Sequence, residues 1–290
     1  MSRLQGAVAR YCDVHRQGLT KLEAAGKASA SHDARLLLQH VSGLEHSALI
    51  SRWLDLCPEE TRREFAELVE RRVGGEPVFR IMGQREFYGL GFTVTPAVLD
   101  PRPDTELLVD RVLNAYRGRP GPLRFADIGT GSGAIAVAIL ANLANVHCVA
   151  SDISAEALEV ARANSVANGV GARMETRSGD CLQSLDGTFD FIVSNPPYIA
   201  SSEIGALEPE VRLHDPLAAL DGGTDGLDFY RVLLREAGAF LKPDGRLFME
   251  FGIGQALVIA DLAARHDWHL PEVFRDLAGI ERVMVLSAPG

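Results

Sequence analysis

Cysteine is scarce in this sequence, and its few cysteines are scattered. The 290 residues include only four, and no two of them form a CxxC pair or join a Cys/His cluster. Disulfide frameworks and structural metal sites depend on such spacings. We therefore expect reduced thiols and no metal site. The four residues are Cys12, Cys57, Cys148 and Cys181.

Long hydrophobic runs are also missing. The most apolar segment, residues 134–143, is too short for the roughly 20 residues of a membrane-spanning helix. The first residues of the chain lack the apolar core of a signal peptide. We expect a cytoplasmic protein that does not interact with membranes.

Positive charge is scarce beyond residue 75. Residues 76–290 carry eighteen Lys and Arg against twenty-nine Asp and Glu, a balance of −11, and Lys242 is their only lysine. Residues 1–75 carry eleven against ten, a balance of +1. Because DNA binding depends on neutralising phosphates with Lys and Arg, we expect no direct contact with nucleic acid. A basic protein partner suits the acidic part better.

The first part of the chain has the apolar spacing of helices. Ser31 or Asp33 can cap the second helix, and Pro58 is a favoured first residue for the third. We predict that residues 1–76 form a small helical-bundle domain that docks the substrate. The helices are predicted over residues 8–22, 31–43 and 58–73.

Over residues 77–98 the apolar residues no longer follow a helical spacing. This change predicts a β-hairpin that links the helical domain to the rest of the chain. Its extended segments, residues 86–88 and 92–94, flank the turn Gly89-Leu90-Gly91, whose glycines permit a tight backbone. A helix through residues 107–113 follows.

Residues 99–290 alternate between predicted strands and helices, which is typical of a doubly wound α/β sheet. The strands are expected near residues 124–128, 146–151, 172–177, 189–194, 245–251, 268–273 and 281–286, and the helices near 132–143, 154–168, 227–241 and 254–264. No convincing helix separates the last two strands, so we expect one of them to run antiparallel. The fold class is therefore α/β, with a doubly wound, Rossmann-like sheet of seven strands.

A glycine-rich segment follows the first of these strands. Its spacing fits neither a dinucleotide fingerprint nor a phosphate loop. Alternate glycines let a ligand lie against the backbone. Asp127, two residues before the first glycine, would repel pyrophosphate but would accept a hydrogen bond from an ammonium group. The segment favours the amino-acid end of S-adenosylmethionine, and a structural glycine turn is the alternative. It reads Asp127-Ile128-Gly129-Thr130-Gly131-Ser132-Gly133.

Carboxylates follow the next two strands. Asp152, with Ile153 beside it, comes where a carboxylate can accept both ribose hydroxyls of a nucleoside, and it can also cap the following helix. Asp180 can accept the exocyclic amine of an adenine, and Cys181 can pack on its ring. We predict that these residues bind the cofactor S-adenosylmethionine.

A proline-rich tetrapeptide, Asn195-Pro196-Pro197-Tyr198, follows the predicted strand 189–194. Ligands of open α/β sheets bind beyond the carboxyl ends of the strands, so this turn is expected to face the methyl donor. Each residue before a proline is held extended. The Asn195 side-chain oxygen and the Pro196 backbone oxygen can therefore point the same way.

Two fixed acceptors suit a flat nitrogen with two hydrogens, namely a primary amide or an exocyclic amine, and Tyr198 can stack on the planar group. An amide nitrogen is a poor nucleophile because its lone pair is delocalised. Hydrogen bonds to both N–H groups and in-line positioning can compensate. We predict that the four residues of the tetrapeptide are catalytic and bind the substrate, and that Asn195 also contacts the cofactor.

Two loop segments are further candidates. Residues 101–106 are rigid and charged, and residues 221–227 are rich in glycine. For both, a lid or substrate-rim role competes with a plain loop and helix-cap role. From the first segment we predict that Arg102 and Glu106 bind the substrate.

In combination, these motifs resemble the HemK family, the protein-(glutamine-N5) methyltransferases that modify peptide chain release factors. The resemblance extends over almost the whole chain. Besides the helical first domain, the glycine segment and the tetrapeptide, it rests on Arg85-Glu86-Phe87-Tyr88, Pro101-Arg102-Pro103-Asp104-Thr105-Glu106, Ala219-Leu220-Asp221-Gly222-Gly223, Asp225-Gly226-Leu227 and Met249-Glu250-Phe251-Gly252 with Gln255.

The resemblance implies a methyltransferase fold and methylation of the glutamine in the Gly-Gly-Gln motif of bacterial release factors. It implies that residues 129–133, Asp152 and Asn195 contact the methyl donor and that residues 195–198 hold the glutamine. The protein partner would then be a release factor, and we expect a monomer.

The chain departs from the family's pattern at three positions. An apolar residue is usual in place of Asp100, Glu in place of Asp104, and often a bulky aromatic in place of Cys181.

Two other acceptors stay open at this point. A glutamine in a ribosomal protein would need the same chemistry, since only the docking surface differs. A DNA adenine-N6 methyltransferase would use the same tetrapeptide to bind the exocyclic amine of adenine. The acidic charge of residues 76–290 and the absence of a target-recognition domain argue against this acceptor.

Overall fold

The computed structural model describes residues 8–269 and 271–289 and divides into two compact units, one ending at Gly83 and the other beginning at Gln84. The β-hairpin therefore lies in the second unit, whereas residues 77–83 lie in the first. Each unit has a hydrophobic core of its own. Within the described ranges, no helix is both long and apolar enough to cross a bilayer. The roles assigned to the domains above stay predictions.

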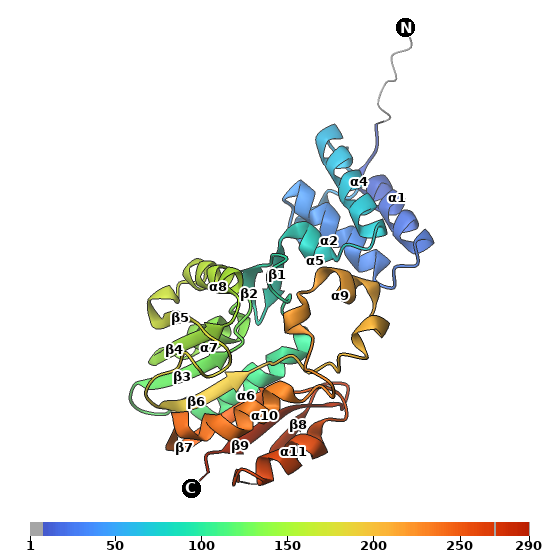
Figure 1. Cartoon of the computed structure of the whole chain (residues 1–290). Coiled ribbons are helices and arrows are strands. Elements are labelled where there is room, and N and C mark those ends of the chain that lie inside the picture. Colours follow the sequence, from blue (N-terminus) through green and yellow to red (C-terminus); the bar gives the residue numbers. More distant parts are fainter. Residues whose placement is uncertain (1–7, 270, 290) are drawn as a thin grey trace. The chain divides into compact units, whose positions relative to one another are not determined.

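The described residues of the first unit form a small helical bundle (Figure 1). Its helices are α1 (Tyr11–Ala24), α2 (Ala30–Ser42), α3 (His46–Ser51), α4 (Glu59–Val73) and α5 (Val78–Met82). Their apolar sides enclose Leu22, Leu37 and Phe65. Gly18 lets α1 approach α4 closely, because a Cβ there would lie 2.5 Å from Phe65 Cζ. The sequence did not predict α3 and α5, which are too short to show a helical period.

The start of α2 differs from the expectation. The helix begins at Ala30 with Ser29 as its N-cap, so the predicted cap at Ser31 or Asp33 was wrong. Asp33 is instead buried, and its Oδ2 accepts hydrogen bonds from Arg72 Nε at 2.6 Å and from Ser29 Oγ at 2.8 Å. A buried carboxylate needs such partners, and the partner on α4 is not visible in the local sequence.

The hairpin of the second unit has a shorter turn than predicted. Strands β1 (Gln84–Phe87) and β2 (Leu90–Thr93) are joined only by Tyr88 and Gly89, whose φ angles are 54° and 73°. Positive φ at both positions is typical of two-residue hairpin turns. Tyr88 is held in this conformation by Glu106, whose Oε1 accepts a hydrogen bond from the Tyr88 backbone N–H at 2.8 Å.

A seven-stranded sheet forms the centre of the second unit, with the strand order β5-β4-β3-β6-β7-β9-β8. The strands are β3 (Leu123–Ile128), β4 (Val146–Asp152), β5 (Met174–Ser178), β6 (Phe189–Ser194), β7 (Leu241–Glu250), β8 (Glu272–Arg275) and β9 (Glu281–Ser287). Strands β3 to β7 are parallel, and β9 is antiparallel to both of its neighbours. The predicted antiparallel strand is thus confirmed.

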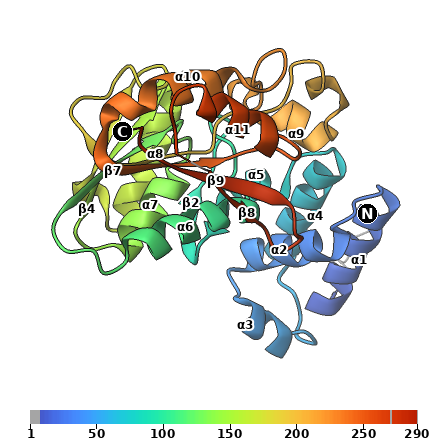
Figure 2. The same ribbon diagram turned by 90° about the horizontal axis from the view of Figure 1, so that it is seen from below.

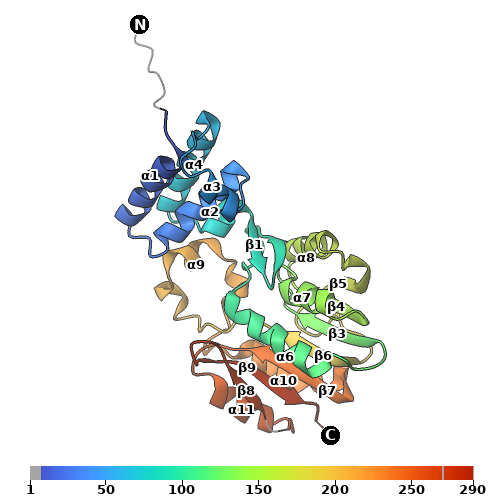
Figure 3. The same cartoon turned by 180° about the vertical axis from the view of Figure 1, so that it is seen from behind.

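Helices cover both faces of this sheet (Figures 2 and 3). They are α6 (Glu106–Tyr116), α7 (Ala134–Asn142) and α8 (Ala155–Ala167) on one face, and α10 (Asp228–Glu236) and α11 (Ala256–Ala264) on the other. Alternate strand residues point to opposite faces: Phe125 and Phe191 pack against the first layer, whereas Ala126 and Ile192 pack against the second. This confirms the predicted doubly wound α/β fold.

Three predicted boundaries in the last part of the chain were wrong. The helix expected over residues 227–241 ends at Glu236, and a short 3-10 turn leads into β7, which begins earlier than expected. The strand expected near residues 268–273 begins only at Glu272. Trp268 is buried before it, and its Nε1 donates a hydrogen bond to the Leu234 carbonyl at 2.8 Å. This anchor ties the segment to α10 instead of the sheet.

Candidate active site

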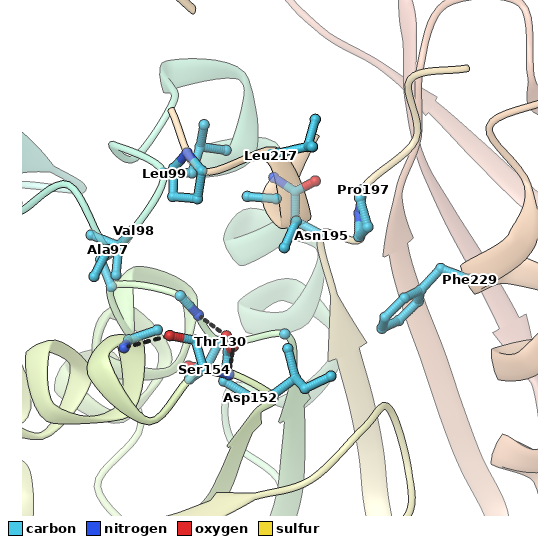
Figure 4. Close-up of a pocket in the computed structure, with 18 of the residues that line it drawn as sticks. Ala97, Val98, Leu99, Thr130, Asp152, Ser154, Asn195, Pro197, Leu217 and Phe229 are labelled. Atoms are coloured by element: carbon cyan, nitrogen blue, oxygen red, sulfur yellow. Dashed lines mark hydrogen bonds between the residues drawn. The ribbon is translucent and has the colours of Figure 1, made fainter. Parts of the chain in front are cut away.

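A cavity of about 950 Å³ opens in the second unit at the carboxyl ends of β3, β4 and β6. From β3 the chain continues to β4 and β5 on one side, and it then crosses back to β6 on the other side of β3. Such a switch point in the strand order is where open α/β sheets bind ligands. The volume suits a small-molecule cofactor. Figure 4 shows Asn195 and Leu217 on one side of the opening, with Thr130, Asp152 and Ser154 across from them.

The glycine segment between β3 and α7 forms one end of the cavity, which we call the donor end. Gly129, Gly131 and Gly133 have φ angles of 71°, 55° and 79°, a left-handed conformation that favours glycine. The backbone N–H groups of Gly129 and Thr130 both donate to the Ser151 carbonyl at 2.9 Å. The turn is therefore tied to β4, and its exposed backbone faces the cavity.

Asp127 lies beneath the glycine segment. Its side chain is fully buried, and Oδ2 accepts a hydrogen bond from Thr130 Oγ1 at 2.7 Å, while Oδ1 has no hydrogen-bond partner within the described residues. Burial raises the pKa of Asp127 to about 7, although the hydrogen bond from Thr130 opposes the shift. Asp127 is not among the residues that line the cavity.

Asp152 lines the cavity and connects two backbone segments. Its Oδ2 accepts a hydrogen bond from the Gly131 N–H and its Oδ1 from the Ser154 N–H, both at 2.9 Å. The helix cap is Ser154, whose Oγ accepts from the Ala157 N–H at 3.1 Å. Each carboxylate oxygen has further lone pairs, so Asp152 can still accept hydroxyl groups of a ligand.

Asp180 and Cys181 line the same end of the cavity, and exposed Ile153 lies at its edge. Cys181 adopts a left-handed conformation with φ of 49°, which is uncommon for a residue with a Cβ. Burial raises the pKa of its thiol to about 12. The thiol therefore stays neutral and serves as a packing surface, not as a nucleophile.

Asn195 follows β6 at the opposite side of the cavity, which we call the acceptor end. Its Nδ2 donates a hydrogen bond to Thr105 Oγ1 at 3.2 Å, and both residues line the cavity. Because the amide nitrogen is turned toward Thr105, the amide oxygen is turned away from it. Pro196 is buried, whereas Pro197 lines the cavity near Phe229 (Figure 4).

Three glycines allow other loops to approach the tetrapeptide closely. A Cβ on Gly222 would lie 2.8 Å from the Pro197 carbonyl oxygen, and one on Gly226 would lie 2.3 Å from that of Tyr198. A Cβ on Gly252 would lie 2.9 Å from Cδ2 of the Tyr198 ring. The glycine-rich segment 221–227 therefore supports the tetrapeptide directly, in addition to lining the cavity.

Gln255 fixes the same junction through its side-chain amide. Its Nε2 donates a hydrogen bond to the Tyr198 carbonyl at 3.0 Å, and its Oε1 accepts one from the Gly252 N–H at 2.9 Å. The backbone of the tetrapeptide is thus held from two sides, and Tyr198 itself is not among the cavity-lining residues.

The two predicted substrate residues of segment 101–106 lie in different places. Arg102 lines the cavity, and its side chain bonds Asp215 at 2.7 Å and lies 3.4 Å from Asp100. Glu106 does not line the cavity, and its carboxylate bonds the hairpin turn at Tyr88. The structure therefore brings one of them to the site and uses the other to support the hairpin.

Most of the predicted site residues meet at this one cavity. Those that line it are Arg102, Gly129, Thr130, Gly131, Ser132, Asp152, Ile153, Asp180, Cys181, Asn195 and Pro197; those that do not are Glu106, Asp127, Gly133, Pro196 and Tyr198.

Sequence reasoning missed the apolar walls, which include Val98, Leu99, Leu217 and Phe229. Leu217 is exposed in the folded chain, but its neighbours Pro216 and Ala218 are not polar, so no pattern in the sequence marks it as part of the wall.

The charged residues that line the cavity are mostly acidic. Six carboxylates line it, whereas Arg102 is its one cationic residue within the described ranges. Arg102 is already paired with acids. A cavity of this kind repels phosphate groups and favours a ligand that carries positive charge. The acids are Asp100, Asp152, Glu156, Asp180, Asp221 and Asp228.

Comparisons with known proteins agree with this geometry. Residues 13–83 match the family described as PrmC N-terminal domain, and residues 101–207 match the methyltransferase small domain. A solved methyltransferase from Pyrococcus furiosus shares the fold, with a TM-score of 0.53 at 20% identity over 78% of this chain and 100% of that one. The fold and the cavity therefore define a methyltransferase.

Two curated relatives narrow the class to a family. The release factor glutamine methyltransferase of Agrobacterium fabrum is 43% identical over 267 residues, covering 91% of this chain and 92% of its own. That of Bradyrhizobium diazoefficiens is 45% identical over 269 residues, covering 91% and 90%. The chain belongs to the family of release factor glutamine methyltransferases.

Proposed function

We propose that this enzyme transfers a methyl group from S-adenosylmethionine to the side-chain amide nitrogen N5 of the glutamine in the Gly-Gly-Gln motif of bacterial peptide chain release factors. The observation that carries the proposal is the position of Asn195, which lines the cavity opposite the glycine segment and turns its amide nitrogen toward Thr105. The names of the relatives point to the same acceptor.

The donor end of the cavity fits S-adenosylmethionine. The backbone of Gly129 and Gly131 is open, since a Cβ at either position would meet no atom within 4 Å. Asp152 keeps lone pairs for ribose hydroxyls, and Asp180 and Cys181 are proposed to contact the adenine. When bound, the donor supplies an electrophilic methyl group on a positively charged sulfur, and the acidic lining suits that charge.

The acceptor end supplies hydrogen-bond acceptors for the glutamine. We assign the two N–H groups of the substrate amide to Asn195 Oδ1 and the Pro196 backbone oxygen, and the stacking surface to Tyr198. Held in this way, the amide nitrogen is oriented with its lone pair toward the methyl group, and positioning of this kind supplies roughly 7–11 kcal/mol of the barrier reduction. The new nitrogen–carbon bond forms as the sulfur–carbon bond breaks, and the nitrogen then releases its proton to water.

Other parts of the chain have proposed roles in substrate recognition. Arg102 and Glu106 are proposed substrate contacts, Arg102 through its place in the cavity wall. The first unit, which ends at Gly83, is proposed to dock the release factor. The enzyme is proposed to act as a cytoplasmic monomer.

The proposal is tested by incubating the protein and its Asn195→Ala variant with purified release factors and S-adenosylmethionine. Tandem mass spectrometry should place one added methyl group on the glutamine of the Gly-Gly-Gln peptide with the wild type only. If a ribosomal protein were methylated and release factors were not, the substrate would be the glutamine of the ribosomal protein. Tight, salt-sensitive binding of DNA in a gel shift would favour the adenine acceptor instead.

A further inference from the structure

Glu250 is a buried acid that the proposed function does not use. It is the last residue of β7, next to β6, and Ser194 pairs with Met249 across these parallel strands. Asn195 and Glu250 therefore leave neighbouring strands side by side. Glu250 is 3% exposed and is not among the residues that line the cavity.

The side chain of Glu250 contacts the two residues that orient the acceptor end. Thr105 and Asn195 act on its carboxylate as side-chain hydrogen-bond donors that hold its pKa down, while Oε2 is buried with no hydrogen-bond partner in the described part of the chain. Thr105 and Asn195 are themselves bonded, with 3.2 Å between Asn195 Nδ2 and Thr105 Oγ1. Three side chains from distant parts of the sequence thus form one hydrogen-bonded set behind the cavity wall.

The ionised carboxylate determines the direction of every hydrogen bond in this set. A carboxylate only accepts hydrogen bonds, whereas the Thr105 hydroxyl has one proton to donate. When Thr105 donates to Glu250, it can only accept from Asn195, which must present Nδ2. The direct bond from Asn195 to Glu250 requires the same orientation. The Asn195 amide is therefore held with its oxygen available to the cavity.

The orientation of this amide decides what the substrate meets. The two ends of an asparagine amide have nearly the same shape and opposite hydrogen-bonding character. With its oxygen toward the cavity, Asn195 accepts a hydrogen bond from the substrate nitrogen. With the amide reversed, it presents N–H groups to the N–H groups of the substrate and repels them.

We infer that Glu250 is a positioning residue, which acts through Thr105 to hold the Asn195 amide with its oxygen toward the glutamine. This inference rests on the proposed function, because it assumes that Asn195 accepts a hydrogen bond from an N–H group of the acceptor.

Protonation of Glu250 makes the orientation of the Asn195 amide sensitive to pH. Burial raises the pKa of Glu250 to about 7; Arg282 and the bonds from Thr105 and Asn195 oppose the shift, while Asp104 adds to it. The Tyr198 and Tyr230 hydroxyls are the other titratable groups that interact with it, and burial raises the pKa of both. A protonated Glu250 can donate to Thr105, so the direction of the bonds is no longer imposed. Turnover at saturating donor should therefore fall as the pH drops through about 7.

The test compares wild type with Glu250→Gln, which keeps the shape but can both donate and accept. At pH 8 we expect kcat on a release factor to fall on the order of 10- to 100-fold, with an unchanged dissociation constant for S-adenosylmethionine by calorimetry. The decline of kcat below about pH 7 should disappear in the variant. Glu272→Gln, an exposed position on β8, is the matched control and should behave as wild type.

Two further variants separate orientation from folding. Thr105→Val, which lacks the hydroxyl, should reproduce the loss of kcat, whereas Thr105→Ser should restore most of it. In the free protein, the side-chain amide NMR signals of Asn195, assigned by their loss in Asn195→Asp, should shift with pH near 7 in wild type and not in Glu250→Gln.

The inference is overturned if Glu250→Gln retains the wild-type kcat and pH profile, or if its loss of activity accompanies a lower melting temperature and weaker donor binding. A wild-type enzyme that is inactive on release factors would overturn the proposed function instead, and the amide signals in the free protein would still test the role of Glu250.

Discussion

The two ends of the cavity are built in different ways. At the donor end, the geometry comes from nearby backbone: the glycine segment turns through left-handed positions, and Asp152 bonds the N–H groups of Gly131 and Ser154. At the acceptor end, Asn195 depends on side chains that lie far away in the sequence, namely Thr105 and Glu250. A short motif therefore describes the donor end almost completely and the acceptor end only in part.

Each end nevertheless contains one buried acid with an unusual pKa. Burial raises the pKa of Asp127 beneath the glycine segment and that of Glu250 behind Asn195, in both cases to about 7. The comparison between the ends predicts that the first acid affects donor binding and that the second affects turnover.

The largest expected effect separates the two ends. Asn195→Ala should lower kcat by about 10³-fold, because it removes a hydrogen bond that matters most in the transition state, and should change the donor dissociation constant only a few-fold. Single-turnover methylation and calorimetry measure the two quantities. Asn145→Ala, at an exposed turn, is the control. A parallel loss of donor affinity would mean that the ends do not act separately.

A matched pair of glycine variants tests how closely each end is packed. Gly226 and Gly129 have similar φ angles of 75° and 71°, but a Cβ would lie 2.3 Å from the Tyr198 carbonyl oxygen at Gly226 and would meet no atom within 4 Å at Gly129. Gly129→Ala should lower the free energy of unfolding by about 1–2 kcal/mol through strain alone. Gly226→Ala should lower it by about 3 kcal/mol or more, because a backbone clash is added.

Urea unfolding at one pH measures both glycine variants. Equal losses of stability would show that the tetrapeptide moves aside easily and that its support is not rigid.

The buried acid of the donor end predicts a dependence of stability on pH. The folded-state pKa of Asp127 is raised from 3.8 to about 7, so its contribution to stability is fully present below about pH 4 and is lost as the pH rises through about 7. Between pH 5.5 and 8.5 this loss amounts to about 2 kcal/mol, and Asp127→Asn should abolish it. We also expect this variant to bind the donor more weakly and to keep its kcat at saturating donor.

Urea unfolding at both pH values and donor calorimetry provide the check for Asp127. A variant with the wild-type pH dependence of stability would contradict the assignment of this titration to Asp127. Glu250→Gln serves as the comparison, since it should remove a similar dependence without weakening donor binding.

The smallest effect concerns the helix cap beside Asp152. Ser154→Ala removes the bond from the Ala157 N–H to Ser154 Oγ and should lower the free energy of unfolding by about 1 kcal/mol. Because the role of Ser154 is local, kcat should not change. Ser154→Asp keeps a capping oxygen and should retain the stability. A large loss of kcat in Ser154→Ala would show that the cap also positions the donor.

Most of the architecture followed from the sequence, because it depends on local patterns. The alternation of apolar strands and helices predicted the doubly wound sheet and its antiparallel strand, both of which the structure confirms. Elements with little periodicity were missed, such as α3, α5 and α9 (Pro209–His214). A helix of one or two turns leaves too few apolar repeats to be recognised.

In the site, too, the residues that follow a local sequence pattern were predicted and the others were not. The glycine segment and Asp152 were predicted because each occupies a defined distance from the end of a strand, and both line the cavity. The wall formed by Leu217 and Phe229 was not predicted. Leu217 lies in a short 3-10 turn that carries no spacing signal, and Phe229 is one of several apolar residues in the first turns of α10. Glu106 was predicted to bind substrate, and its bond to the hairpin turn became visible only in the folded chain.

By itself, the sequence determined the class of chemistry. It encodes a glycine turn, a carboxylate after the next strand and a rigid Asn-Pro-Pro-Tyr turn, each in a few neighbouring residues. The backbone preferences of these residues do not depend on the rest of the fold. Only the tertiary structure decided how Asn195 presents its amide. The two ends of that amide differ in hydrogen bonding and hardly in shape, so their orientation depends on the partners Thr105 and Glu250, which the fold brings together from opposite ends of the domain.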